Sequence, residues 1–405
     1  MTGHQWRAFS AAYLGWTLDA FDYFLLVLLA RAMAADFGTG LKAMSYAIGL
    51  TLAMRPVGAL VFGLIADRFG RRPALMGSIL LYAVAELLTG FAPSLGALFA
   101  MRALFGIGMG GEWGVGASLA MESIPARSRG LLSGVLQQGY PMGYLLAALV
   151  VGHVYPHVGW RGTFILGALP AVLVLYVRIG VRESPAWLEE QAAPSGAARG
   201  LAAVRATIRE RWPLFLYMVV LMTAFNSFSH GTQDLYPSGF LGKQRGLPLA
   251  TIANITIIGC LGGITGGILF GALSQRFGRR RTIAGAALLS ISMIPLWLGP
   301  SSVAGLAAGA FLMQFAVQGA WGVVPAHLNE LSPGAVRGTF PGLAYQLGNL
   351  GASSIVPLQA TLAESGGGSY SSALGWFVGV VGVILALIAL AGPESRTARL
   401  APEAA

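Results

Sequence analysis

Six polar residues that could bind a small anion or carry a proton lie in one otherwise apolar stretch near the middle of the chain. They are Asn226, Ser229, His230, Thr232, Gln233 and Asp234. If this stretch is helical, Asn226, Ser229/His230, Gln233/Asp234 and Pro237 recur at i, i+3, i+4 and i+7 and form one polar stripe. His230 and Asp234, four residues apart, can share a hydrogen bond, and an imidazole beside a carboxylate is suited to carrying a proton near neutral pH. The alternative is a hydrogen-bond network that only holds this helix to its neighbours. Six polar groups on one stripe favour transport chemistry.

The chain around this stretch has the composition of a membrane protein. Of its 405 residues, 55% are hydrophobic and 10% are charged, and the mean hydropathy is +0.68. These values exclude a water-soluble protein. The net charge of +10 does not indicate nucleic-acid binding, because the basic residues form short clusters between apolar runs. The chain has a single cysteine, Cys260, which excludes an intrachain disulfide. A metal site at His230 and Asp234 is not expected, because no third ligand of matching spacing appears near them.

Apolar runs long enough to cross a bilayer recur along the whole sequence. They predict twelve helical spans, at 9–34, 44–66, 74–92, 95–122, 130–155, 163–181, 213–239, 250–274, 282–299, 303–329, 338–362 and 370–392. The first span is too long for a signal peptide and is interrupted by acidic residues, so we expect it to be retained. The domains predicted from this pattern are an N-terminal half, a cytoplasmic linker, a C-terminal half and a cytoplasmic tail, over 1–182, 183–212, 213–392 and 393–405.

The basic residues predict the orientation. Most of the 26 Lys and Arg residues fall in segments that are cytoplasmic if both termini lie inside the cell, including the cluster at 276–281. We therefore expect a multi-pass protein of the cell membrane with both termini cytoplasmic. We expect it to function as a monomer in the lipid bilayer.

The two halves resemble each other at a constant offset of 208 residues. Segment 63–72 matches segment 271–280, Trp113 matches Trp321, and Gln138 matches Gln346. A parallel duplication of this kind places the substrate site between the halves, near the middle of the bilayer.

Several motifs carry a family resemblance. The G-x-x-x-D-R-x-G-R-R loop at 63–72, its second copy with Gln275 in place of the aspartate, and the spacing of Arg102, Gly106 and Gly108 resemble the major facilitator superfamily. The polar stripe of the seventh span resembles the signature of lactate and pyruvate proton symporters within the sialate:proton symporter family, with Ser238 in place of a final threonine. The resemblance implies twelve transmembrane helices in two pseudo-symmetric halves, and an all-α fold.

The first span carries two candidates for proton coupling. Its sequence around Asp19 and Asp22 is similar to an acidic motif of the same family, and Asp22 is equivalent to His230 at the 208-residue offset. We therefore expect Asp22 and His230 on opposite walls of one cavity. For Asp22, the alternative is a structural bond to polar groups of the fourth or fifth span.

Candidate substrate contacts lie on several spans. Arg55 is in a pattern that the resemblance places at the cavity, and a guanidinium can hold a carboxylate through two parallel hydrogen bonds. Arg55 is our first choice for the substrate carboxylate. Family likeness adds Gln346 and Asn349, one helical turn apart, and the fifth span offers Gln138 and Tyr140.

Other charged residues are candidates for gating. Asp67, Arg68 and Arg71 lie just beyond the cytoplasmic end of the second span, where they could form an inward gate or only anchor the topology. We expect Arg102 to join an internal charge network with Glu112 or Asp19. Glu86 receives no role, and His327 is interpreted as a packed histidine. The G-x-G-x-x-G pattern at 106–111 is interpreted as close helix packing, because no strand precedes it.

Together these observations indicate a secondary carrier and not an enzyme, with the proton as coupling ion and no cofactor. The resemblance narrows the function to proton-coupled uptake of a small monocarboxylate such as lactate or pyruvate. One alternative is a symporter for a larger organic acid, such as a sialic or aromatic acid. A drug exporter or a non-transporting sensor agrees less well with the motifs.

Overall fold

The structure is a computed structural model that describes residues 2–123, 129–168, 171–184, 187–188, 201–333, 336, 339–367 and 369–394. Every regular element in these ranges is a helix. The N-terminal half contains α1 (Gly3–Asp36), α2 (Leu41–Phe69), α3 (Arg71–Gly90), α4 (Leu95–Ser123), α5 (Arg129–Gln137), α6 (Gly139–His153), α7 (Tyr155–Leu166) and α8 (Ala171–Gly180).

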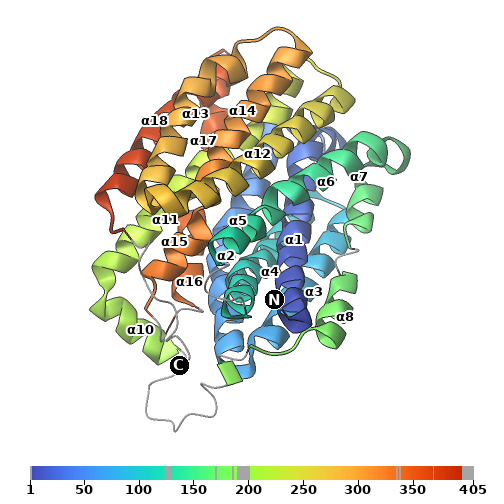
Figure 1. Cartoon of the computed structure of the whole chain (residues 1–405). Helices are drawn as coiled ribbons and strands as arrows, with labels where there is room; N and C mark the ends of the chain where they lie inside the picture. The colour runs from blue at the N-terminus through green and yellow to red at the C-terminus, as the bar shows by residue number, and fades with distance from the viewer. Residues whose placement is uncertain are drawn as a thin grey trace.

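The C-terminal half repeats this order. It contains α11 (Trp212–Gln233), the π-helix η2 (Tyr236–Gln244), α12 (Leu249–Phe277), α13 (Arg279–Leu298), α14 (Val303–Trp321), α15 (Val324–Leu331), α16 (Phe340–Ala352), α17 (Ile355–Ser365) and α18 (Tyr370–Ala391). Figure 1 shows the blue to green helices of the first half beside the yellow to red helices of the second. The predicted all-α membrane fold with two six-span halves is confirmed.

Five of the twelve predicted spans are interrupted. The fifth, sixth, seventh, tenth and eleventh are each divided into two helices, at α5/α6, α7/α8, α11/η2, α14/α15 and α16/α17. At η2, α15 and α16 a proline occupies the first turn, where a missing backbone N–H is tolerated. Pro237 therefore lies in the π-helix and does not continue the α-helical stripe of α11.

Seven helical segments in the described ranges are long and apolar enough, by themselves, to cross a membrane. They are α2, α3, α11 with η2, α12, α13, α14 with α15, and α18. Three of the five other spans are divided into shorter helices. The last two, α1 and α4, are long but carry buried acidic residues along their apolar length.

Glycines allow the helices of each half to approach closely. A Cβ atom at Gly58 of α2 would lie 1.8 Å from the backbone oxygen of Ile107 of α4, and one at Gly110 would lie 1.9 Å from that of Arg55. Gly266 of α12 makes the equivalent approach to Phe315 of α14. Within the G-x-G-x-x-G pattern, a Cβ atom at Gly106 would lie 2.3 Å from the backbone oxygen of Thr51 of α2. The pattern therefore lies in a helix–helix interface, as the sequence indicated.

Among the described residues of the polar segment between the halves, α10 (Leu201–Glu210) lies within the predicted linker. Figure 1 shows α10 at the same end of the bundle as the N-terminus. Residues 189–200 of the predicted linker and 395–405 of the predicted tail lie outside the described residues.

Candidate functional site

Arg55 of α2 lies fully buried between aromatic rings of both halves. Its guanidinium carbon is 5.9 Å from the ring centre of Trp16 and 5.6 Å from that of Tyr345. The Nε and Nη2 atoms have no hydrogen-bond partner among the described residues. These two atoms form one edge of the planar guanidinium, which is the geometry that binds a carboxylate through two parallel hydrogen bonds.

Two acidic residues lie near this open edge without pairing to it. Asp19 of α1 and Glu112 of α4 are completely buried, and both are within electrostatic range of Arg55. No ion pair within 4.0 Å joins either of them to Arg55 in the described structure, and their four carboxylate oxygens have no hydrogen-bond partner there. We call Arg55, Asp19 and Glu112 the open cluster.

Aromatic side chains from both halves surround the open cluster. Trp16 stacks on Tyr140 of α6, with ring centres 5.3 Å apart, and Trp113 of α4 stacks on Tyr345 of α16 at 4.4 Å. Tyr345 also meets the ring of Trp321 at 5.7 Å. The cluster therefore lies at the interface of the halves, where the sequence duplication predicts a substrate site.

His230 and Asp234 share the hydrogen bond that their spacing predicts, with 3.0 Å between Nδ1 and Oδ2. The hydroxyl of Tyr23 on α1 donates to the same Asp234 oxygen at 2.9 Å and lies 3.2 Å from His230 Nδ1. These three buried residues join the first helix of one half to the first helix of the other. Sequence reasoning missed Tyr23, and the only signal for it was its place directly after Asp22.

Asp22 does not face His230. It lies within electrostatic range of Asp19, Glu86 and Arg102, inside the N-terminal half. The expectation of Asp22 and His230 on opposite walls of one cavity is therefore wrong. Asp22 is buried on the side of α1 that faces its own half, and Tyr23 is the residue of this motif that crosses to His230.

Arg102 also differs from the prediction. Its Nη2 atom donates to Glu86 Oε2 and, at 2.6 Å, to Thr89 Oγ1, both on α3. No ion pair in the described residues joins Arg102 to Glu112 or Asp19, the partners expected from sequence. We call Asp22, Glu86 and Arg102 the closed cluster, because its arginine is already paired.

The side chains of the remaining residues of the α11 stripe bond within the C-terminal half. Gln233 Nε2 donates to Gln314 Oε1 of α14 at 2.9 Å, and Asn226 Nδ2 donates to the backbone oxygen of Met222 at 2.8 Å. Ser229 is buried on the same helix, and its backbone oxygen accepts a bond from Thr232. The stripe therefore faces the interior of the protein along its whole length.

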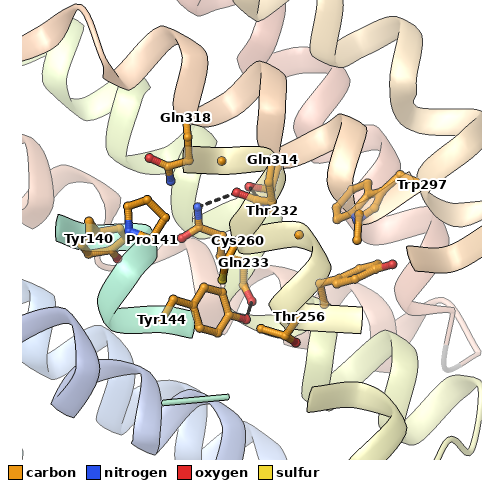
Figure 2. A pocket seen from close by; sticks show the side chains of 14 residues that line it. Tyr140, Pro141, Tyr144, Thr232, Gln233, Thr256, Cys260, Trp297, Gln314 and Gln318 are labelled. Carbon is orange, nitrogen blue, oxygen red and sulfur yellow. Dashed lines mark hydrogen bonds between the residues drawn. The ribbon is translucent and has the colours of Figure 1, made fainter. Parts of the chain in front are cut away.

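A small cavity of about 20 Å³ lies beside Gln233. Figure 2 shows Tyr140, Pro141 and Tyr144 of α6 on one side of it. Thr256 and Cys260 of α12, Trp297 of α13, and Gln314 and Gln318 of α14 form other parts of the wall. Tyr140 also stacks on Trp16, which lies beside Arg55, so these two rings connect the cavity to the open cluster.

Gln346 and Asn349 of α16 bond to each other at 2.8 Å, from Asn349 Nδ2 to Gln346 Oε1. Gln346 Nε2 also reaches the backbone oxygen of Gly110 in the other half at 3.4 Å. Gln138, at the start of α6, donates to the backbone oxygen of Gly134 and lies against Gly267 of α12. All three side chains are buried, and Gln346 and Gln138 lie at contacts between the halves.

The loop after α2 forms a charge network. Arg71 pairs with Asp67 at 2.9 Å and with Glu122 of α4 at 3.4 Å, and Thr339 of the other half donates to Asp67 at 2.6 Å. Arg68 is exposed and lies over the ring of Phe69. The bond between Thr339 and Asp67 is a contact between halves that must break if they separate at this end.

The second copy of the loop forms a similar network. Arg279 pairs with Glu330 at 2.9 Å, at the position equivalent to Arg71 and Glu122. Gly70 and Gly278, which precede the two arginines, have φ angles of 107° and 92°, in the region that favours glycine. Glu183 and Glu394 accept backbone N–H bonds at the starts of α3 and α13.

Comparison with known proteins places the chain among transporters. Residues 39–211 match the family model described as Sugar (and other) transporter, and residues 231–405 match the Major Facilitator Superfamily. The chain is 30% identical to the sialic acid transporter NanX of Escherichia coli K12, over 96% of this chain and 94% of that protein. It is 28% identical to a carboxylic acid transporter protein homolog of Saccharomyces cerevisiae, over 90% of this chain, and spans 62% of that relative's length.

A solved structure supports the fold. The proton:xylose symporter XylE, bound to 6-bromo-6-deoxy-D-glucose, superposes with a TM-score of 0.73 at 21% sequence identity. The superposition covers 96% of both chains. At this level of identity the likeness concerns the fold alone, and it agrees with the twelve-span arrangement described above.

Proposed function

Because the chain belongs to the major facilitator superfamily and, within it, to the sialate:proton symporter family, we propose that it carries a small monocarboxylate such as lactate or pyruvate into the cell together with a proton. The observation that carries this proposal is the open edge of Arg55. A guanidinium buried between aromatic rings with two unpaired N–H groups is a suitable site for a carboxylate.

The charges around Arg55 favour symport. Asp19 and Glu112 together can carry two negative charges beside one positive charge, and a bound monocarboxylate adds another. Buried charge without compensation is strongly unfavourable, so the loaded site is more stable when it also takes up a proton. Anion and proton then cross together as the halves rock around the fixed site.

We assign proton coupling to His230, Asp234, Asp22 and Asp19. The short contacts among Tyr23, His230 and Asp234 allow a proton to pass between the halves when they are in contact. Further substrate contacts are assigned to Asn226, Ser229, Gln233, Gln346, Asn349, Tyr140 and Gln138, and gating to Asp67, Arg68, Arg71, Arg102 and Glu112. The carrier acts as a monomer, with both termini in the cytoplasm.

The test is uptake of labelled lactate and pyruvate into proteoliposomes with an imposed pH gradient. We expect saturable uptake that an inward proton gradient stimulates and a protonophore abolishes. Uptake that is unchanged after collapse of the gradient would remove the symport mechanism. Asp234→Asn is expected to lose accumulation while keeping substrate exchange, because the amide preserves the shape of the carboxyl group but does not titrate.

A second candidate is a larger organic acid. The cavity beside Gln233 is small, but it is lined by aromatic rings and by amides, and Tyr140 and Trp16 connect it to Arg55. A longer substrate could place its carboxylate at Arg55 and its body in this cavity once the cavity widens on binding. The name of the Escherichia coli relative, a sialic acid transporter, agrees with this candidate. Competition by sialic acid or benzoate that exceeds competition by unlabelled pyruvate would favour it.

A further inference from the structure

An apolar groove lies between α13 and α18 on the surface of the C-terminal half, where Figure 1 shows the two helices side by side. Ile294 and Leu298 of α13 form one wall. The other wall is one face of α18, lined by residues three or four apart from Ser371 to Ile384. The groove has a volume of about 680 Å³, and its lining residues are apolar except for two serines at one end.

The groove has the dimensions of a lipid chain. A Cβ atom at Gly379 would lie 3.9 Å from Cδ1 of Ile294, with no closer atom of another helix, so the groove continues past this glycine. Trp376, which is 79% exposed, lines the groove one helical turn away. The lined face of α18 rises about 20 Å at about 1.5 Å per residue. One leaflet contributes about 15 Å to the hydrocarbon core, so an extended acyl chain fits along the groove.

One end of the groove is polar. α13 starts at the charge network of the second loop copy, so its last residue, Leu298, lies at the opposite end of the bundle. The end of η2 crosses the groove there. Gln244 exchanges two hydrogen bonds with Ser371, both 2.9 Å long, and Arg245 Nη2 donates to the backbone oxygen of Leu298 at 2.9 Å. Because Ser371 and Leu298 line opposite walls, this short segment is fixed to both of them.

This polar end carries positive charge. Lys243 is exposed, and its ammonium nitrogen lies 5.5 Å from the ring centre of Tyr370, the first residue of α18. No ion pair within 4.0 Å involves Lys243 or Arg245 in the described part of the chain. An exposed ammonium group at the end of an apolar groove is complementary to an anion that carries a hydrocarbon chain.

We propose that this groove binds one anionic phospholipid, with an acyl chain along α13 and α18 and the phosphate beside Lys243. In the predicted orientation the lipid belongs to the outer leaflet. Lipid chains are as apolar as the groove, so the chain contact alone distinguishes little between one lipid and another. The contact between Lys243 and a net negative headgroup supplies the preference, which is about fivefold for one lysine at a charged lipid surface.

Fluorescence of Trp376 tests the proposal, because bromine atoms on an acyl chain quench a tryptophan that they contact. The full-length protein is placed in nanodiscs of phosphatidylcholine that contain increasing fractions of either brominated phosphatidylglycerol or brominated phosphatidylcholine. The Trp376 signal is the difference between wild type and Trp376→Phe. We expect half-maximal quenching at about a fivefold lower fraction of the brominated phosphatidylglycerol.

Two variants of the groove are matched with two controls. Lys243→Gln should remove the preference for phosphatidylglycerol, because the charge is lost. Gly379→Leu should also remove it, because the leucine side chain occupies the place of the acyl chain. Lys42→Gln, at another predicted outer lysine, and Gly285→Leu, where an added Cβ atom meets nothing within 4 Å, should both keep it. Lys243 is exposed, so its variant decides the matter even if Gly379→Leu does not fold.

Several outcomes would overturn the proposal. Equal quenching by the two lipids in wild type would show that any lipid covers the groove. A preference that survives in Lys243→Gln would separate the headgroup from this lysine, and a preference abolished by millimolar inorganic phosphate would indicate a site for the free anion. Protection of Trp376 from both lipids, in a dimer that Gly379→Leu dissociates, would identify a second copy of the chain as the occupant. None of these measurements depends on transport.

Discussion

Two clusters in the N-terminal half have the same composition and opposite arrangements. Each contains two acidic residues and one arginine, all fully buried. In the closed cluster Arg102 is bonded to Glu86, whereas in the open cluster Arg55 keeps one edge of its guanidinium free while Asp19 and Glu112 remain beyond ion-pair distance. Residue type therefore does not distinguish an arginine with an open edge from an arginine that is already paired. The two arginines differ in whether the guanidinium already forms an ion pair with a carboxylate of the protein itself.

The surroundings of the two arginines explain the difference. Arg55 is flanked by Trp16 of its own half and by Tyr345 of the other half, so its environment changes when the halves move. Arg102 is flanked by Phe105 and Phe164, both from the N-terminal half, so its neighbouring rings stay the same when the halves move relative to each other. The open cluster therefore lies where the two halves meet, and the closed cluster lies within one of them.

The largest expected effect is a difference in protein stability between variants of the two arginines. Arg102→Gln should lower the free energy of unfolding by about 3–5 kcal/mol, because it removes one partner of a buried ion pair. Arg55→Gln should change it by about 1 kcal/mol or less, because no protein carboxylate pairs with Arg55. Thermal unfolding of both variants in the same detergent measures this. Equal losses in the two variants would show that both arginines are structural.

For substrate binding we expect the reverse order, with the larger effect at Arg55. Arg55→Lys should raise the apparent substrate constant about tenfold or more, because an ammonium group cannot reproduce two parallel bonds and the lost charge-assisted bond contributes about 1.5–3 kcal/mol. The measurement is the concentration dependence of uptake, with unfolding followed in parallel. A variant that binds lactate and pyruvate as tightly as wild type would remove Arg55 from the site.

A smaller effect concerns the acidic residues of the open cluster. Asp19→Asn removes a negative charge near Arg55, so the carboxylate substrate should bind about tenfold more tightly, the effect of a like charge about 12 Å away at an effective dielectric constant near 20. Accumulation driven by a pH gradient should fall at the same time, because one proton-binding group is lost. Glu364→Gln serves as the exposed control. Weaker substrate binding in Asp19→Asn would contradict the arrangement described for the open cluster.

The smallest effect is expected at the contact between the halves. Tyr23→Phe removes one hydroxyl that bonds to Asp234, a contribution of about 1 kcal/mol, and leaves His230 and Asp234 bonded to each other. We expect substrate exchange to change only a few-fold and accumulation to persist, in contrast to Asp234→Asn. If Tyr23→Phe abolishes accumulation as completely as Asp234→Asn, the hydroxyl itself carries the proton.

Much of the architecture was predictable because it depends on local sequence. The apolar runs are a property of each segment alone, and they predicted the spans and the two halves. The bond between His230 and Asp234 was predictable for the same reason, since residues four apart on a helix are neighbours whatever surrounds them. The interruptions of five spans were not predicted, because an apolar run has the same composition whether a single crossing is one continuous helix or two shorter ones.

The sequence by itself determined which polar residues are buried in the membrane interior, because an apolar span of fixed length leaves them no route to water. Only the tertiary structure decided which of these residues meet. Asp19 and Asp22 are three residues apart, about 60° around the helix axis, and this rotation sends one toward Arg55 and the other toward Glu86 and Arg102. Tyr23 meets Asp234 only because α1 and α11 come together across the two halves. Such contacts depend on how each helix is rotated and packed against its neighbours, which the pattern along a single helix does not contain.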